Sequence, residues 1–223
     1  MAKIDQAEKN KIKELFNNNL QQEVNLAFFS KETECDYCAD TEEILNELTE
    51  LTEKLAYQKY LLNSDKAAEF GIDKAPAIIF LDQNGADLGV HFFGIPSGYE
   101  FTSLIEDILD VSDQSRIDLA EEIKTEIKSI SEDVLLQVFI TPTCPYCPRA
   151  VRVAHQMAIL NPAITGEMVE AIEFQDLSSR FNVSGVPKTV INSGAAEQVG
   201  AVPAKTILKK IKVSQKNSTV TAE

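Results

Sequence analysis

The sequence contains no uninterrupted run of 18 apolar residues, which is the length that a membrane-spanning helix needs. Its first residues, Met1 to Glu8, also lack the apolar stretch of a secretory signal. Basic side chains are scarce, because 21 Lys and Arg stand against 35 Asp and Glu, for a net charge of −14. A nucleic-acid-binding surface is basic. We therefore expect a cytoplasmic protein that binds neither membranes nor nucleic acid.

A Gly-rich phosphate-binding loop is absent, so we expect the chain to hold no flavin or nicotinamide cofactor of its own. Electrons for a redox reaction must then come from another protein or from a small thiol. Histidine is rare, and we expect His91 and His155 to be ordinary packed or exposed side chains rather than acid–base catalysts.

The acidic charge is concentrated in the first half of the chain. Residues 1–112 hold 9 Lys and 22 Asp or Glu, whereas the remaining residues have a net charge of only −1. The simplest interpretation is an acidic, solvated surface that aids solubility. Such a surface can also select basic or neutral partners.

The four cysteines form two motifs of the form Cys-x-Tyr-Cys, Cys35 to Cys38 and Cys144 to Cys147. Each motif follows a run of β-prone apolar residues and precedes a helical pattern, which is typical of a thiol redox site. Free N–H groups and the helix dipole at a helix N-terminus favour the reactive thiolate. We expect the first cysteine of each motif to be exposed at the helix cap and to act as nucleophile. The second, in the first helical turn, then resolves the mixed disulfide.

The pattern of predicted elements is the same around both motifs. Residues 70–76 align without a gap with residues 181–187, and a Gly and Pro element at 94–96 recurs at 200–203. Such repetition predicts two copies of one domain, residues 1–112 and 113–223, joined by little linker and packed on each other. Each copy is expected to be α/β, with a mixed sheet and helices on both faces.

The expected elements follow the spacing of apolar residues and the turn signals between them. In the first copy they are helix 5–20, strand 23–30, helix 38–55, strand 57–62, helix 65–70, strands 77–81 and 88–93, and helix 100–109. In the second copy they are helix 114–128, strand 134–140, helix 144–160, strand 169–174, helix 177–181, strands 188–191 and 198–200, and helix 204–213. Residues 214–223 are polar, and we expect them to be disordered.

Zinc binding and a purely structural disulfide stay open as roles for the cysteines. Four cysteines could bind one zinc ion, but 105 residues separate the pairs, far more than the spacer of a zinc ribbon. A structural disulfide is also compatible with each pair, although this short spacing gives a small and reducible loop. Redox chemistry explains the pattern better, and we expect no metal site.

Pro76 and Pro187 stand at corresponding places, each just before a predicted strand. One interpretation is the start of an edge strand, where proline removes a single ladder donor. The alternative is a cis-proline that faces the cysteines. In that case the preceding residue, Ala75 or Val186, is free to pair with a substrate strand.

Taken together, these features resemble the thioredoxin superfamily. Cys144-Pro145-Tyr146-Cys147 is the glutaredoxin-type motif, and the two complete units resemble the two-domain glutaredoxin-like protein disulfide oxidoreductases. The resemblance implies reduction, oxidation or isomerisation of protein disulfides, with a thioredoxin reductase or a small thiol as electron donor. It also implies catalytic residues Cys35, Cys38, Cys144 and Cys147, and substrate-binding residues Tyr37, Ala75, Pro76, Tyr146, Val186 and Pro187.

The first motif departs from the second in charge. Glu34 and Asp36 flank Cys35, where Thr143 and Pro145 flank the second nucleophile. A carboxylate about 6 Å from a thiolate costs roughly 1 kcal/mol at an effective dielectric constant of about 40–60. This repulsion destabilises the reduced first site, and a less stable dithiol is the better reductant. We therefore predict that the first site is the more reducing one.

Two further functions are compatible with the sequence. The chain could be a dedicated electron-transfer partner of a peroxiredoxin or of a thioredoxin-reductase system, and it would then lack broad activity on disulfide proteins. It could also be a redox-independent chaperone of thioredoxin fold, in which case Cys-to-Ser variants keep full function.

Overall fold

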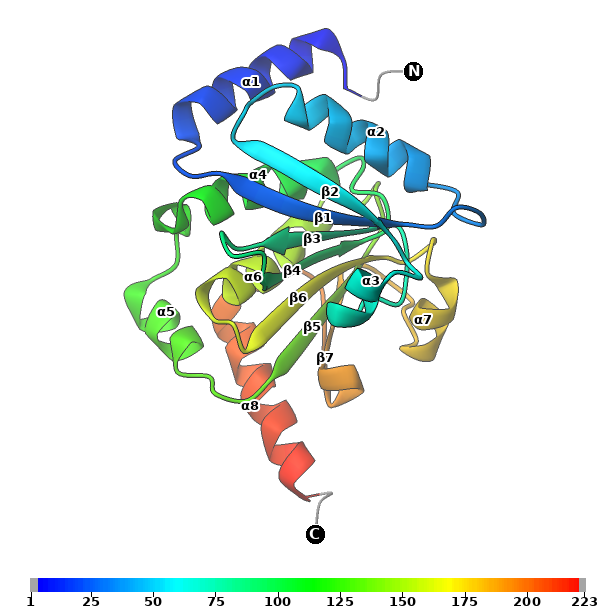
Figure 1. Ribbon diagram of the computed structural model, residues 1–223. Coiled ribbons are helices and arrows are strands. Elements are labelled where there is room, and N and C mark those ends of the chain that lie inside the picture. The colour runs from blue at the N-terminus through cyan, green and yellow to red at the C-terminus, as the bar shows by residue number, and fades with distance from the viewer. Residues whose placement is uncertain (1–3, 221–223) are drawn as a thin grey trace.

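The computed structural model describes residues 4–220, with side chains described through residue 215. The first half contains α1 (Gln6–Asn19), β1 (Val24–Ser30), α2 (Cys38–Thr49), β2 (Leu55–Leu61), α3 (Asp65–Glu69), β3 (Ala77–Leu81), β4 (Asp87–Phe93) and α4 (Glu100–Ser112) (Figure 1). The second half contains α5 (Glu121–Lys128), β5 (Val134–Ile140), α6 (Cys147–Leu160), β6 (Ile164–Glu170), α7 (Gln175–Arg180), β7 (Lys188–Ile191), β8 (Ala196–Val199) and α8 (Ala204–Val220).

Local sequence explains where several of these elements begin. Asp5 precedes α1, and its Oδ1 accepts the N–H of Glu8 at 2.8 Å, which satisfies one free donor of the first turn. Ser64 caps α3 in the same way by accepting the N–H of Ala67. β1 and β5 are almost continuously buried, as expected for strands that are covered on both faces.

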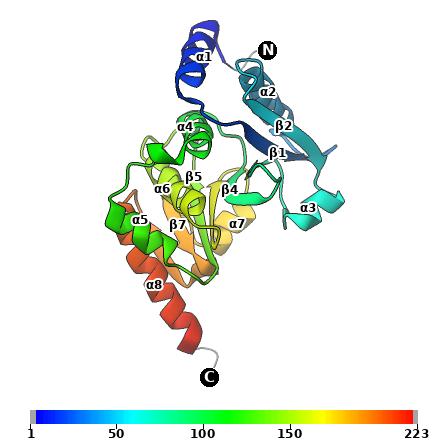
Figure 2. The same cartoon turned by 60° about the vertical axis from the view of Figure 1, so that its left-hand side comes forward.

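All eight strands join in one sheet, in the order β2-β1-β3-β4-β6-β5-β7-β8. Each half contributes four strands with the same internal topology: the motif-bearing strand pairs in parallel with one neighbour and antiparallel with the other. The halves meet where β4 pairs in parallel with β6. The expected mixed sheet with helices on both faces is confirmed, and the turned view in Figure 2 shows the two halves side by side. Division into domains at residues 112 and 113 stays a proposal; α4 ends at this point.

The hydrophobic core lies on both faces of the sheet. The larger core cluster is covered by α1, α2, α4, α6 and α8 and runs through both halves, whereas the smaller one lies beneath α3 and α7. Because the larger cluster is continuous across the β4–β6 joint, the two halves share buried apolar surface as well as backbone hydrogen bonds.

A buried charged network crosses the joint between α4 and α6. Arg152 contacts Asp107 at 2.7 Å and Asp110 at 2.6 Å, and His155 Nδ1 lies 2.5 Å from the second oxygen of Asp107. Removing one member of such a network leaves a buried charge without its partner. His155 is fully buried and His91 is 5% exposed beside Asp87, so both histidines are packed side chains, as expected.

Several predicted boundaries are wrong. Residues 114–128 do not form one helix, because the Asp113 side chain caps a single 3-10 turn and the fully buried Ile117 is extended; α5 begins only at Glu121. The helix predicted to reach residue 55 ends at Thr49, since Leu55 is the first residue of β2 and pairs with β1. Apolar spacing alone cannot distinguish a leucine at a helix end from one at a strand start.

Two further corrections concern the second half. The strand predicted at 169–174 is β6, Ile164–Glu170; after it the Glu170 carboxylate accepts the N–H groups of Ile172 and Glu173 and turns the chain. The prediction of disorder from residue 214 is also wrong, because α8 continues to Val220. The predicted disorder of 221–223 lies outside the described residues.

Candidate functional site

The sheet topology brings the two cysteine motifs to the same edge. β1 is antiparallel to β3, β3 is antiparallel to β4, and β4, β6 and β5 are mutually parallel, so β1 and β5 point the same way. Each motif follows the C-terminal end of one of these two strands. The strands are four positions apart in the sheet. At a strand spacing of about 4.8 Å this separates the motifs by about 19 Å, too far for direct disulfide exchange between them.

In the second motif, Cys147 is the first residue of α6 and Cys144 lies in the turn before it. The turn is held by the N–H of Cys144, which donates to the Thr141 carbonyl at 3.0 Å, and by the N–H of Cys147, which donates to the Cys144 carbonyl. Both thiols are free. The expectation that the first cysteine is exposed is wrong here, because Cys144 is only 8% exposed.

The loop before β7 covers Cys144. The Val186–Pro187 peptide bond is cis, and the Cys144 thiol donates to the Val186 carbonyl, with the sulfur 3.8 Å from the oxygen. The cis-proline interpretation is therefore confirmed at this site, and its predicted partner residue is in contact with the cysteine. Tyr146, by contrast, is 65% exposed.

The Cys147 thiol is fully buried, and this burial is the largest cause of its raised pKa. A hydrogen bond with the Cys144 thiol and the negative charges of Cys144 and Glu100 raise the pKa further. A buried thiol of this kind needs a proton acceptor before it can attack a disulfide.

Glu100, the first residue of α4, supplies a carboxyl group near Cys147 from the other half of the chain. Its side chain is fully buried; burial raises its pKa to about 7, whereas a hydrogen bond donated by the Ser103 hydroxyl at 2.6 Å lowers it. Among the described residues its Oε1 atom has no hydrogen-bond partner. Sequence reasoning missed Glu100, and the only signal was an acidic residue at the start of an apolar helix.

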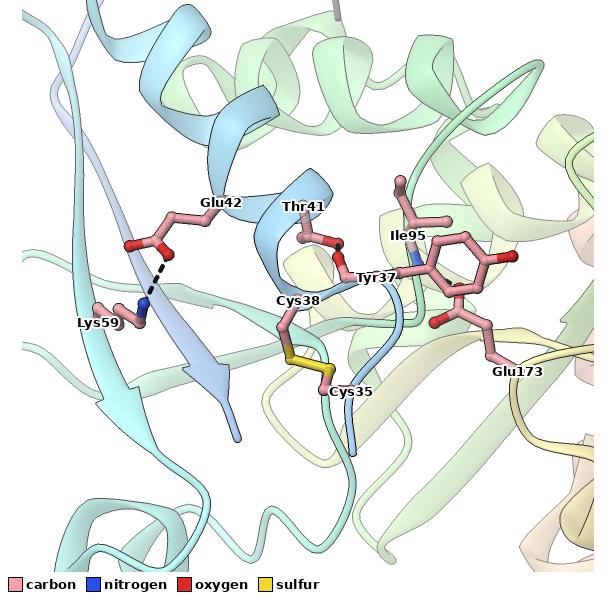
Figure 3. Close-up of a disulfide and its surroundings, with 8 residues drawn as sticks. All are labelled: Cys35, Tyr37, Cys38, Thr41, Glu42, Lys59, Ile95 and Glu173. Carbon is pink, nitrogen blue, oxygen red and sulfur yellow. Dashed lines mark hydrogen bonds and ion pairs between the residues drawn. A yellow bond between two sulfur atoms is a disulfide. The ribbon is translucent and has the colours of Figure 1, made fainter. Parts of the chain in front are cut away.

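In the first motif, Cys35 and Cys38 form a disulfide, and Cys38 is the first residue of α2 (Figure 3). Cys35 is half-buried and Cys38 is buried. Tyr37 is 41% exposed, and its carbonyl accepts the Thr41 hydroxyl at 2.8 Å, which fixes the start of the helix. The Ala75–Pro76 bond is also cis, so the cis-proline interpretation is confirmed at both sites.

A cleft of about 1130 Å³ opens beside this disulfide, and both halves of the chain line it. One wall holds the predicted site residues of the first half together: Cys35, Tyr37, Ala75 and Pro76, with Lys31, Glu34, Asp36, Asp73 and Lys74. The opposite wall comes from the second half: Ile172, Glu173, Phe174, Gln175, Asp176, Leu177 and Arg180.

Glu173 is the buried carboxyl group of this cleft. Burial raises its pKa to about 7, and the charges of Glu170 and Asp36 add to the shift, whereas the Ile95 N–H lowers it by donating to Oε1 at 2.6 Å. Figure 3 shows the Glu173 side chain directed toward Ile95 and the Tyr37 ring. Sequence reasoning missed this residue as well, because it comes from the half that does not carry Cys35.

The loop between β4 and α4 links the two sites. At one end Ile95 is held by Glu173, and at the other end the Tyr99 N–H donates to the Pro142 carbonyl at 3.0 Å. Gly98 has φ +60°, and an added Cβ would lie 2.3 Å from the Pro142 oxygen, so this close approach requires glycine. The loop thus touches residues that precede Cys144 and residues that line the cleft of Cys35.

Metal and membrane features bear on the chemistry as well. Within residues 4–220 no group of three or more His, Cys, Asp or Glu side chains is arranged to hold a metal ion. No helix in that range is long and apolar enough to cross a membrane.

Comparison with known proteins gives consistent matches. Residues 134–212 match the family model described as Thioredoxin domain. The structure of a protein disulfide oxidoreductase from Aeropyrum pernix aligns with a TM-score of 0.84, at 29% identity, over 93% of this chain and 92% of that one. A structure of the alkylhydroperoxide reductase flavoprotein component AhpF from Enterococcus faecalis aligns with a TM-score of 0.85, at 25% identity, over 93% of this chain and 99% of that one.

A curated relative, a protein of Bacillus subtilis named NADH dehydrogenase, is 30% identical over 80% of this chain but only 32% of its own length. The chain therefore spans about a third of the length of the curated relatives it matches. With its two Cys-x-x-Cys pairs and eight-stranded sheet, the chain has the two-domain fold of the thioredoxin superfamily.

Proposed function

We propose that this thioredoxin-superfamily chain is a protein disulfide oxidoreductase that works through two separate sites. The observation that carries the proposal is the repeated geometry: each half places a Cys-x-x-Cys pair at a helix start, with a cis-proline loop beside it. The similarity to a solved protein disulfide oxidoreductase, at 29% identity over nearly the whole chain, supports it.

At the second site, the Cys144 thiolate attacks one sulfur of a substrate disulfide. A mixed disulfide forms and the remaining substrate sulfur leaves as a thiolate. The Cys147 thiol then loses its proton and attacks the Cys144 sulfur, which releases the second substrate thiolate and leaves a Cys144–Cys147 disulfide. Two electrons have then passed to the substrate. Glu100 is the proton acceptor for Cys147, because its carboxyl group is coupled to that thiol and is buried with it.

The first site performs the same two steps with Cys35 as nucleophile and Cys38 as resolving thiol. The backbone groups of Ala75 and Val186, next to the cis-prolines, pair with the extended substrate segment at the two sites. Tyr37 and Tyr146 are exposed beside the nucleophiles and offer apolar contact to the substrate.

A thioredoxin reductase or a small thiol reduces the two sites again, and the chain itself carries no cofactor. In a reducing cytoplasm the net reaction is reduction of protein disulfides; where intracellular disulfides are abundant, formation or shuffling becomes possible.

Reduction of insulin disulfides with dithiothreitol as electron source tests this proposal. We expect the wild type to catalyse the reaction, and Cys35→Ser and Cys144→Ser each to remove the contribution of one site. The double variant should have no activity. If the double variant equals the wild type, the redox proposal is wrong and a redox-independent chaperone role replaces it.

The similarity to AhpF of alkylhydroperoxide reductase favours a second candidate, a dedicated electron carrier to a peroxiredoxin. The two candidates differ in breadth. A dedicated carrier reduces one peroxidase rapidly and insulin poorly, whereas a general oxidoreductase reduces insulin and unrelated disulfide proteins at similar rates.

A further inference from the structure

We propose that the cleft beside Cys35 selects disulfides flanked by cationic residues, so that the two sites serve substrates of different charge. This inference rests on the proposed function and names a substrate class for its first site. The occupant is an extended segment of a protein substrate that carries Lys or Arg next to its disulfide.

The size and position of the cleft fit such a segment. Its volume of about 1130 Å³ exceeds that of a pocket for a drug-sized molecule, and Cys35 and Pro76 lie in its wall. Ile172, which is 61% exposed, adds apolar surface on the opposite wall. A disulfide that reaches Cys35 must therefore place the residues around it between the two halves of the chain.

The charge of the lining is negative. Five carboxylates and three cationic side chains line the cleft. Two of the cations are engaged: the Lys74 ammonium lies 2.6 Å from Asp73 and over the Phe93 ring, and Arg180 lies over the Phe181 ring. Among the described residues, no ion-pair partner is found for Glu34, Asp36 or Asp176, and all three are exposed.

These three carboxylates surround the nucleophile from both sides. Glu34 and Asp36 are its immediate neighbours in sequence, and Asp176 stands on α7 in the opposite wall. A substrate ammonium about 8 Å from one carboxylate gains about threefold in rate or affinity at an effective dielectric constant of about 60. Two or three such carboxylates give about tenfold preference for a cationic over an anionic disulfide after screening by salt.

The second site lacks this feature. Thr143 and Pro145 flank Cys144, and the exposed charge that follows in α6 is Arg149. An anionic disulfide is therefore not repelled there. The contrast between the sites provides an internal reference, because both perform the same thiol chemistry.

The test uses two reduced proteins, a first-site protein (Cys144→Ser/Cys147→Ser) and a second-site protein (Cys35→Ser/Cys38→Ser). Each reacts with cystamine (cationic), 2-hydroxyethyl disulfide (neutral) and 3,3′-dithiodipropionate (anionic), and rapid quenching follows the loss of protein thiols. We expect the ratio of cationic to anionic rates to be about tenfold larger at the first site than at the second. The excess should disappear in about 1 M salt, where the Debye length is about 3 Å.

Charge-neutralising variants of the first-site protein locate the effect. Glu34→Gln/Asp36→Asn should bring the ratio close to that of the second site, and Asp176→Asn should lower it about threefold without touching the cysteine motif. Glu132→Gln/Asp133→Asn removes two exposed carboxylates just before β5, at the opposite edge of the sheet, and should leave the ratio unchanged.

Equal ratios at the two sites in low salt, or a first-site ratio unaffected by these cleft variants, would overturn the inference. The neutral probe separates this failure from failure of the proposed function. If the first-site protein reduces the neutral probe without charge preference, only the inference falls; if neither protein reduces it, the proposed function falls and the inference with it.

Discussion

Glu100 and Cys147 belong to opposite halves of the chain, yet the carboxyl group of one is electrostatically coupled to the thiol of the other. Glu173 repeats this relationship in the other direction, because it comes from the second half and lines the cleft of Cys35. Each cysteine site is therefore completed by a buried carboxyl group from the half that does not carry it.

We predict that Glu100→Gln slows the second half-reaction at Cys144 more than the first. Attack by the buried Cys147 thiol needs a proton acceptor, and loss of a general base costs about a hundredfold or more. In single-turnover experiments at pH 7 the Cys144 mixed disulfide should then accumulate, while its formation rate stays near that of the wild type. Glu106→Gln, on the same helix and partly exposed, is the matched control. Equal resolution rates in wild type and Glu100→Gln would remove Glu100 from the mechanism.

The same substitution should change stability with pH. The pKa of Glu100 is raised in the folded protein from 4.5 to about 7, so between these values the folded state holds a proton that the unfolded chain releases. Stability therefore falls as pH rises through this interval, by at most about 3 kcal/mol. Urea unfolding should find Glu100→Gln more stable than the wild type at pH 8 and little different at pH 5. A Glu100→Gln protein less stable at pH 8 would contradict this.

Gly98→Ala should disturb the loop that links the two sites. The added Cβ would meet the Pro142 carbonyl at 2.3 Å, and φ is +60°. Gly85→Ala is the matched control, because Gly85 has φ +82° but no atom within 4 Å of the added Cβ. Both variants carry the backbone penalty of about 1–2 kcal/mol, so any greater loss in Gly98→Ala measures the clash. We expect that greater loss in urea unfolding, together with slower turnover at Cys144; equal losses would mean that the loop moves freely.

Glu173 should make charge selection at the first site depend on pH. Its pKa is about 7, and the groups that face it are Glu170, Asp36 and the Ile95 N–H. Ionisation above pH 7 adds a negative charge to the cleft. The ratio of cystamine to dithiodipropionate rates in the first-site protein should therefore rise between pH 6 and 8. Taking the ratio cancels ionisation of the attacking thiol. Glu173→Gln should flatten the profile, and a flat wild-type profile would exclude this role.

The two sites should also differ in redox potential. Repulsion by Glu34 and Asp36 destabilises the reduced Cys35 site, so we predict that the first site is more reducing than the second. A difference of roughly 1 kcal/mol corresponds to about 20 mV for a two-electron couple. Titration of the two single-site proteins against a glutathione buffer measures it, and the reverse order would contradict the prediction.

Much of the site could be predicted from the sequence because it is local. The spacing of each Cys-x-Tyr-Cys motif, the strand before it and the helix after it are properties of adjacent residues, and the structure keeps them. The matched prolines were also recognisable from the internal repeat, and both peptide bonds are cis.

The rest depends on contacts between residues far apart in the chain. The sequence patterns of β4 and β6 do not say that they pair with each other, and that pairing determines which surfaces meet. Glu100 and Glu173 look like ordinary helix-start and loop carboxylates until the other half covers them. The burial of Cys144 has the same origin, because the Val186 loop that covers it is 42 residues away.

Trapping of mixed disulfides tests the central claim, that both sites exchange disulfides through a first-cysteine nucleophile and a resolving second cysteine. Cys38→Ser and Cys147→Ser, each in the matching single-site protein, would be reacted with oxidised insulin chains and mapped by mass spectrometry after acid quenching. The account predicts stable adducts on Cys35 in one protein and on Cys144 in the other, and no adduct in variants that lack the first cysteine. Absence of an adduct at either first cysteine would contradict the claim for that site.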